Sequence, residues 1–379
     1  MSKNAGTSAL VLAGAPEWDA DLLYVTGFSA PDPIVYVAAG CWRVMMVSAL
    51  EYGRARAACR ACGIRVLTPQ QAGLNGAARR DIACWILALL EQRGICKVRV
   101  PAAFPSGILR RLEKAGIAVD ILTKEPFPQR RIKTADELQK ITETQRAAVI
   151  AMRAAIGLLA DSQVDQAGLL RMGRAIVSAE MVQRRVTDIL LRHGCYCGQT
   201  IVACGAQGAD PHERGSGPLA AHQPIVIDIF PRHQVHGYCG DITRTVVKGQ
   251  APRALKHMYH TVKGAHAAAL REVRAGAATR TVHQAAVNWI ARRGYPSGHD
   301  ENGFFGFMHA TGHGLGLALH EAPSLGGSGH TRLRIGDVIT IEPGLYYPEI
   351  GGIRIEDTVT VTATGWRYLV PCEKNCEIP

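Results

Sequence analysis

Two pairs of acidic residues stand at similar intervals in the second half of the sequence. Asp228 and Asp241 are 13 positions apart, and Glu342 and Glu356 are 14 positions apart. Each pair flanks a turn-rich segment and has β-branched neighbours, so each pair is predicted to lie on neighbouring strands of a hairpin. Four carboxylates that meet cannot all ionise without compensation, because close like charges raise one another's pKa. Divalent cations relieve this repulsion, and oxygen-rich ligand sets favour ions such as Mn²⁺.

A glycine-rich run between the two pairs, "FMHATGHGLGLALHEAPSL", contains His309, His313 and His320. His313 stands between two glycines, which allow close backbone approach and unusual torsions. Such a histidine is a poor core residue and a good ligand or catalytic group, although taken alone a structural role stays open. The four carboxylates favour the functional interpretation. Two cations held about 3.5–4 Å apart can activate a water molecule and polarise a carbonyl group.

The first third of the sequence predicts a layered α/β domain. Helical stretches near 51–62, 77–93 and 106–115 alternate with short apolar runs that are typical of strands. A first strand is expected in the apolar patch after Lys3. The later strand-like runs are "LLYVTGF", "PIVYVAA", "WRVMMVS", "GIRVLTP", "CKVRVP" and "IAVDIL".

A proline-punctuated boundary follows at Pro126 and Pro128. Thr134 and Glu137 form a predicted capping box at the start of a long helix that opens a second domain. The predicted domains are therefore residues 1–128 and 129–379.

The second domain has a weak internal repeat. Helical stretches near 166–194 precede the aspartate hairpin, and helical stretches near 252–293 precede the glutamate hairpin. This repeat predicts a pseudo-twofold fold in which the four carboxylates converge on the axis.

Composition indicates a folded, cytoplasmic protein. Hydrophobic residues make up 47% of the 379 positions, which is enough for a sizeable core. No apolar run approaches the about 18 residues that span a bilayer, and the patch after Lys3 is too short for a secretory signal. The 11 scattered cysteines favour free thiols, and the CxxC at Cys59 and Cys62 is interpreted as two packed thiols rather than a zinc or redox site.

The net charge of +11 is compatible with nucleic-acid binding, but the pattern of charge does not favour it. The basic residues are dispersed, and aromatic residues make up only 6% of the chain. A solvated basic surface is therefore expected rather than a nucleic-acid interface.

The chain resembles the pita-bread metallopeptidases, a family that includes Xaa-Pro dipeptidase, aminopeptidase P and methionine aminopeptidase. The segments that carry the resemblance are "GYCGDITRTV", "HATGHGLGLALHEAP", "ITIEPGLYY" and "GGIRIEDTV", in the family's order. In the first domain and the linker, "DLLYVTGF" and "RRIKTADELQKI" are similar to the proline-specific members. The resemblance implies a two-domain α/β protein, with a creatinase-like amino-terminal α/β domain and a pita-bread α+β catalytic domain.

The resemblance implies a dinuclear metal site at five positions. Asp228 would bind one ion, His313 and Glu342 the other, and Asp241 and Glu356 would bridge both. Two divalent ions are expected, with Mn²⁺ preferred and with Co²⁺, Fe²⁺ or Zn²⁺ also tolerated by these ligands.

Further residues are assigned to catalysis and substrate binding by the resemblance. His212 and His320 match histidines that lie close to the substrate, although each taken singly also fits a structural role. Glu342 doubles as the general base or acid for the attacking water. His309 and Arg354 complete the expected substrate-binding set.

Two neighbours are expected to support the metal ligands through hydrogen bonds. Thr243 shares a strand face with Asp241, and Arg354 shares one with Glu356. Each pair is therefore predicted to be in contact.

The connection between the two aspartates, residues 229–240, is two residues longer than is common in the family. It contains His233 and His236, and this HxxH raises the possibility of a separate metal site. A longer turn with surface histidines is the preferred interpretation.

The implied activity is hydrolysis of Xaa-Pro bonds in dipeptides or at peptide N-termini, by a hydroxide that the two metal ions activate. The substrate would be a small peptide with proline at its second position. Xaa-Pro dipeptidase and aminopeptidase P share these motifs, so the choice between them stays open. The resemblance also implies a homodimer, and neither a nucleic-acid nor a membrane partner is expected.

Two alternative hypotheses remain. One is a metal-dependent hydrolase or lyase of a non-peptide small molecule on the same fold. The other is a non-catalytic binding module for protein or nucleic acid, against which the five intact ligand positions argue.

Overall fold

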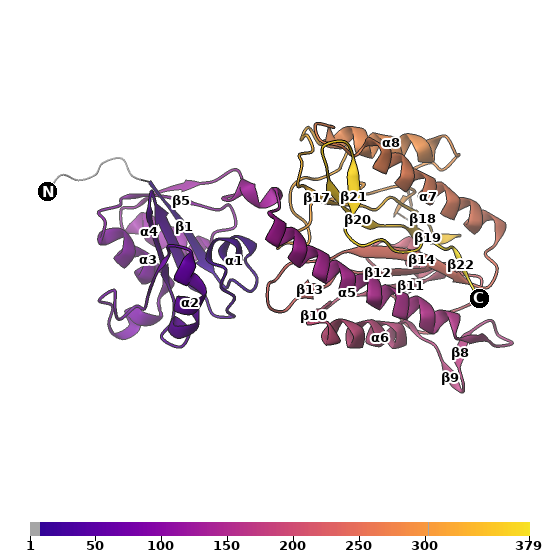
Figure 1. Cartoon of the computed structure of the whole chain (residues 1–379), viewed down its shortest axis with the longest axis horizontal. Helices are drawn as coiled ribbons and strands as arrows, with labels where there is room; N and C mark the ends of the chain where they lie inside the picture. Colours follow the sequence, from indigo (N-terminus) through magenta and orange to yellow (C-terminus); the bar gives the residue numbers. More distant parts are fainter. Residues whose placement is uncertain (1–7, 302) are drawn as a thin grey trace. The chain divides into compact units, whose positions relative to one another are not determined.

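The computed structural model describes residues 8–301 and 303–379, and the chain divides into two compact units between Arg130 and Arg131 (Figure 1). The predicted boundary between residues 128 and 129 lies two residues before this division. All 11 cysteines are free thiols. Over the described ranges, none of the helices is both long enough and apolar enough to cross a membrane.

The first unit is a three-layer α/β structure around a mixed six-stranded sheet. The strand order is β4-β3-β2-β1-β5-β6, with β1, β2 and β3 antiparallel and the remaining pairs parallel. Alternate residues of the strands enter two apolar cores, which contain residues of α3 and α4 on one side and of α1 and α2 on the other. The elements are β1 (Ser8–Gly14), α1 (Ala20–Thr26), β2 (Ile34–Ala39), β3 (Trp42–Met46), α2 (Tyr52–Ala58), β4 (Arg65–Leu67), α3 (Ile82–Glu91), β5 (Lys97–Val100), α4 (Ser106–Lys114) and β6 (Ala118–Ile121).

The prediction of a strand at "LLYVTGF" was wrong, because this segment forms helix α1. The side chain of Asp19 accepts hydrogen bonds from the N–H groups of Asp21 and Leu22, both at 2.9 Å, and so caps the first turn. Gly27 ends the helix in the left-handed region, with a φ of 61°. These capping signals outweigh the strand preference of the β-branched residues in the segment.

The second unit contains two helix pairs, and each pair packs against its own group of strands. Helices α5 and α6 share a core with β11, β12 and β14, whereas α7 and α8 share a core with β17, β18, β19 and β20. The helices are α5 (Ala135–Ala160), α6 (Ala179–Arg192), α7 (Arg253–Glu272) and α8 (Thr279–Ala291). This duplication agrees with the repeat in the sequence, and the predicted fold class is confirmed.

The strands of the second unit form several small sheets. The largest has four strands in the order β11-β12-β14-β22, and β17-β20-β21 forms another. The strands are β7 (Gln163–Val164), β8 (Leu170–Met172), β9 (Ala175–Ile176), β10 (Cys195–Tyr196), β11 (Ile201–Cys204), β12 (Ile225–Ile229), β13 (Arg232–His233), β14 (Ile242–Lys248), β15 (Gly298–Asp300), β16 (Gly303–Phe305), β17 (Val338–Ile341), β18 (Gly344–Tyr347), β19 (Gly351–Arg354), β20 (Asp357–Val361), β21 (Trp366–Tyr368) and β22 (Glu377–Ile378).

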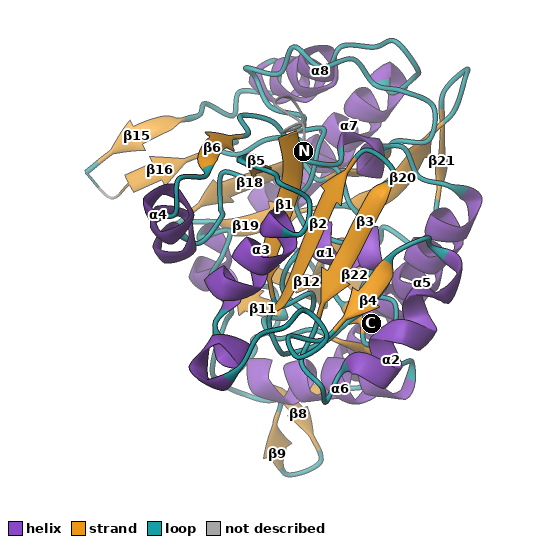
Figure 2. Ribbon diagram, turned by 90° about the vertical axis from the view of Figure 1, so that its left-hand side faces the viewer, coloured by secondary structure: helices purple, strands orange, loops and turns teal. Residues whose placement is uncertain are grey.

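Two predictions for the helices of this unit had different outcomes. The capping box at the start of α5 is present, with the Thr134 side chain accepting from the Glu137 N–H and the Glu137 side chain accepting from the Thr134 N–H. The helix predicted at 166–194 is shorter, because β8 and β9 form a projecting hairpin before α6 (Figure 2). Gly173, at a φ of 59°, makes the turn of this hairpin and interrupts the helical pattern.

A buried ionic cluster fixes β14 beside β20. The Arg244 guanidinium donates to Oδ1 of Asp357 at 2.7 Å and to the main-chain carbonyl of Thr243 at 2.9 Å. Lys374 and His266 approach Oδ2 of Asp357 at 2.6 and 3.0 Å, and the side chains of Asp357 and Arg244 are each 1% exposed. The cluster therefore anchors β14 and β20. These strands begin directly after Asp241 and Glu356, two of the candidate metal ligands.

We expect Asp357→Asn to lower the free energy of unfolding by about 3–5 kcal/mol, because it leaves the Arg244 charge buried without its counter-ion. Urea unfolding of the full chain measures the loss. The matched control is Arg153→Met, which removes the Arg153–Glu373 pair, whose side chains are 52% and 61% exposed. The control should cost at most about 1 kcal/mol, and an equal effect of the two variants would contradict the role of the cluster.

Candidate metal centre

The aspartate pair lies on adjacent antiparallel strands. Asp228 is within β12, and Asp241 immediately precedes β14 (Figure 1). Ile227 and Ile229, the neighbours of Asp228, are fully buried in the core shared with α5 and α6. Because side chains alternate along a strand, the carboxylate of Asp228 points away from this core.

Gln145 of α5 holds Asp241 through two main-chain hydrogen bonds. Its Nε2 donates to the carbonyl of Asp241 at 2.8 Å, and its Oε1 accepts from the N–H of Asp241 at 2.7 Å. Gln145 is 1% exposed, so water does not compete for either bond. Sequence reasoning missed this residue, because its partner is 96 positions away and no local pattern joins them.

The glutamate pair mirrors the aspartate pair. Glu342 follows β17 and Glu356 precedes β20, and these two strands are antiparallel neighbours. The N–H of Glu342 donates to the carbonyl of Thr311 at 2.7 Å, and the N–H of Glu356 donates to the carbonyl of Thr243 at 3.0 Å. The second bond joins the glutamate hairpin to the aspartate hairpin, so the four carboxylates meet.

The glycines beside His313 permit a close main-chain approach. A Cβ atom on Gly312 would lie 1.9 Å from the carbonyl oxygen of Thr340, and one on Gly314 would lie 2.2 Å from that of Ala322. Neither glycine is among those with positive φ, so close approach rather than an unusual torsion requires them.

The Nε2 edge of His313 faces the carboxylates. This atom lies 3.3 Å from Oε1 of Glu342 and 3.6 Å from Oδ2 of Asp241. Nδ1 of the same ring lies 3.1 Å from the carbonyl oxygen of Gly314. A proton on Nδ1 satisfies that carbonyl and leaves the Nε2 lone pair free, which is the form that binds a metal ion.

Electrostatic repulsion disfavours full ionisation of the cluster unless cations compensate the charge. Burial raises the pKa of Asp241 and Glu356 well above the ordinary value, and neighbouring carboxylates raise it further. Burial also raises the pKa of Glu342 to about 7, although the charge of Arg354 opposes this shift. Oδ1 of Asp228 and Oε1 of Glu356 are buried without a hydrogen-bond partner in the described structure. These orphaned oxygens and the His313 lone pair fit divalent metal ions.

The predictions that Thr243 supports Asp241 and that Arg354 supports Glu356 were wrong. The hydroxyl of Thr243 donates to Oε2 of Glu356 at 2.8 Å, and Nη2 of Arg354 donates to Oδ2 of Asp228 at 2.7 Å. Each supports a ligand of the opposite hairpin, which a strand-by-strand analysis of the sequence does not predict. The guanidinium offsets only one of the four carboxylate charges.

His309 belongs to a hydrogen-bonded chain that ends on Asp228. Nε2 of His309 lies 2.9 Å from the hydroxyl of Tyr346, and Nη1 of Arg354 donates to the same hydroxyl at 2.9 Å. Burial and then the charge of Arg354 lower the pKa of His309 to about 4, so the ring is neutral at neutral pH. The prediction from sequence omitted Tyr346, although it stands in "ITIEPGLYY" close to Glu342.

His320 and His212 are exposed beside the buried carboxylates. The His320 ring packs edge-on against His313, with 4.3 Å between centroids. Burial and then the charge of His212 lower the pKa of His320. The charge of His212 also lowers the pKa of His309, after the larger effects of burial and Arg354.

The chain is similar to known metallopeptidases in sequence. The model of "Metallopeptidase family M24" matches residues 139–363. An Xaa-Pro dipeptidase of Pyrococcus horikoshii is 32% identical over 290 residues, which cover 74% of this chain and 75% of that protein. An uncharacterized peptidase of Bacillus subtilis, YqhT, is 37% identical over 175 residues, but the match covers only 47% of that relative.

Solved structures are similar over nearly the whole chain. The prolidase from Pyrococcus horikoshii OT3 has a TM-score of 0.80 at 27% identity, and the match covers 97% of this chain and 95% of that one. An X-Pro aminopeptidase from Thermotoga maritima has a TM-score of 0.81 and covers 99% of this chain and 98% of that one. Its identity of 22% supports the shared fold alone.

We expect Gln145→Met to weaken metal binding by about 10–100-fold, the range typical of changes that disturb a ligand's support. Loss of both main-chain bonds frees Asp241 to move, but all ligand atoms remain. Isothermal titration with Mn²⁺ measures the change, and raising the Mn²⁺ concentration should restore occupancy. Gln139→Met, at an exposed position of the same helix, is the control. Unchanged Mn²⁺ affinity in the Gln145 variant would refute the role of the clamp.

Proposed function

This chain belongs to metallopeptidase family M24, and we propose that it is an exopeptidase that hydrolyses Xaa-Pro bonds. The substrate class is a dipeptide or a short peptide with proline at its second position. The observation that carries the proposal is the convergence of two carboxylate hairpins and His313 in a chain that is 32% identical to an Xaa-Pro dipeptidase over three quarters of its length.

The proposed ligands of two divalent ions are Asp228, Asp241, His313, Glu342 and Glu356. Asp228 would hold one ion and His313 with Glu342 the other, and Asp241 and Glu356 would be shared by both. Mn²⁺ is the proposed native ion because four of the five ligands offer carboxylate oxygens. We also propose a homodimer, which the family resemblance implies, and a cytoplasmic location, which the composition indicates.

When bound, the ions supply polarisation of the scissile carbonyl and a nucleophile from water at neutral pH. Glu342 is proposed to take a proton from the attacking water at a carboxylate oxygen. His320, exposed next to His313, donates a hydrogen bond to the developing oxyanion or a proton to the departing proline nitrogen. His212 and His309 are proposed to contact the peptide. Arg354 is proposed to position Asp228 and, through Tyr346, to orient His309.

The first test is a matched set of peptides offered to metal-stripped protein that has been reloaded with Mn²⁺. We expect cleavage of Ala-Pro or Ala-Pro-Ala and no cleavage of Ala-Ala. Cleavage of Ala-Pro alone identifies a dipeptidase, whereas preference for Ala-Pro-Ala identifies an aminopeptidase P activity. If none of the three is cleaved while both ions are bound, the proposal fails and a non-peptide substrate on this scaffold is favoured.

We expect His320→Ala to reduce kcat by about 10²–10⁴-fold, the usual contribution of a general acid or base. Metal content, measured by atomic emission, should stay unchanged because the ring lies outside the ligand set. His330→Ala, at another exposed histidine, should leave kcat unchanged. A normal kcat in the His320 variant would make that histidine a packing residue.

A further inference from the structure

The turn between the two aspartates buries its histidines. The side chains of His233 and His236 are only 10% and 12% exposed, so the expectation of surface histidines was wrong. The turn is tightly bonded, since the N–H of His233 donates to the carbonyl of Tyr238 and the N–H of Gly237 donates to the carbonyl of His233, both at 3.0 Å. These bonds fix the main chain of the turn, and both rings extend from it toward the same helix.

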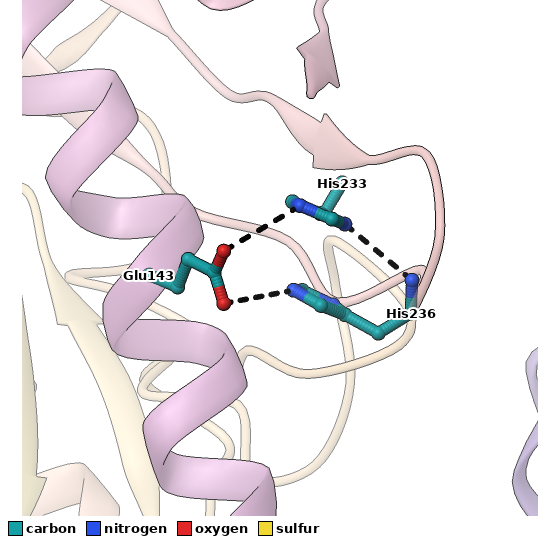
Figure 3. Close-up of side chains that lie close together, drawn as sticks. All are labelled: Glu143, His233 and His236. Atoms are coloured by element: carbon teal, nitrogen blue, oxygen red, sulfur yellow. Dashed lines mark hydrogen bonds and ion pairs between the residues drawn. The ribbon is translucent and has the colours of Figure 1, made fainter. Parts of the chain in front are cut away.

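Both rings direct their Nε2 edges toward Glu143 of α5, as Figure 3 shows. The rings stack with 3.8 Å between centroids and 6° between planes. Nε2 of His233 lies 3.7 Å from Oε1 of Glu143, and Nε2 of His236 lies 3.8 Å from Oε2. These distances exceed a hydrogen bond, and Nε2 of His236 is buried without a partner among the described residues.

We propose that Glu143, His233 and His236 bind a transition-metal ion, with Zn²⁺ the best match, at a site separate from the carboxylate cluster. The three ligand atoms lie within 4.8 Å of one another. Two imidazoles and one carboxylate are ligands that suit Zn²⁺, whereas Mg²⁺ and Ca²⁺ prefer oxygen alone. The Glu143 side chain is 57% exposed, which leaves access for the ion and for a water molecule as a fourth ligand.

Binding requires a proton to move from one ring nitrogen to the other. Nδ1 of His233 accepts from the N–H groups of Val235 at 3.2 Å and of His236 at 3.4 Å, and Nδ1 of His236 accepts from the N–H of Tyr238 at 3.2 Å. The ring protons therefore occupy Nε2, and zinc binding would transfer them to Nδ1 at the cost of these three long bonds. Burial and then the charge of His233 lower the pKa of His236 to about 4, so its ring is neutral at neutral pH.

The rings must also turn, because an imidazole binds an ion in its own plane and parallel planes do not meet at one ion. Gly194 bears no side chain on the Nε2 side of His233, where a Cβ atom would lie 3.2 Å from that nitrogen. An ion held here would tie the connection between Asp228 and Asp241 to α5, the helix whose Gln145 holds Asp241.

The test is the number of zinc ions per full-length chain at equilibrium with micromolar free Zn²⁺, measured by dialysis and atomic emission. We expect His236→Gln and Glu143→Gln each to bind one zinc ion fewer than the unaltered chain. At limiting zinc, the affinity of this site should fall by at least the 10–100-fold typical of outer-shell changes. His193→Gln, an exposed histidine at the end of α6, is the matched control and should bind as the unaltered chain does.

The difference in zinc content between the variants does not depend on the carboxylate cluster, because all of the variants contain the same cluster. The proposal can therefore fail while the peptidase assignment stands, and the reverse also holds. Glu143→Gln replaces an exposed side chain with one of equal size, so folding should be preserved even if His236→Gln unfolds the turn. Equal zinc content in the unaltered chain and in the Glu143 variant at every free zinc concentration would overturn the site.

Discussion

The main constraint on the second unit is that it must hold four mutually repelling carboxylates together in one buried cluster. Burial and mutual repulsion raise the pKa of Asp241, Glu342 and Glu356, and the single guanidinium of Arg354 pairs directly with Asp228. Such a group stays assembled when protons or cations offset its charge and when the surrounding backbone cannot relax. The rest of the second unit supplies this rigidity through two packed cores, each made of a helix pair and its strands.

Hydrogen bonds between the two hairpins support the acidic residues of each. In the aspartate hairpin, the carbonyl of Thr243 accepts from the N–H of Glu356, and the hydroxyl of Thr243 donates to the carboxylate of Glu356. In the glutamate hairpin, Arg354 donates to Asp228. Neither half therefore builds a ligand set alone. The repeated architecture thus supplies carboxylates to the cluster from both halves.

The sequence predicts those features whose cause is local or strictly periodic. The capping box of α5 and the hairpin placement of the acidic pairs are of this kind, since spacing alone determines them. Gln145 and Tyr346 escaped prediction because their partners are distant in sequence and their residue types are ordinary on a helix or a strand. Helix α1 escaped for a different reason, because the caps at Asp19 and Gly27 outweighed the strand preference of its β-branched residues.

The same turn brings two unlike ligand sets close together in sequence. Asp228 and Asp241, at its ends, belong to an oxygen-rich group suited to Mn²⁺, whereas His233 and His236, within it, offer nitrogen to a softer ion. Geometry rather than affinity must then keep the ions apart, because Zn²⁺ binds most mixed sites more tightly than Mn²⁺ does. If the turn binds zinc as proposed, the ion there would tie this connection to α5 through Glu143, whereas ions in the carboxylate cluster would serve the proposed hydrolysis.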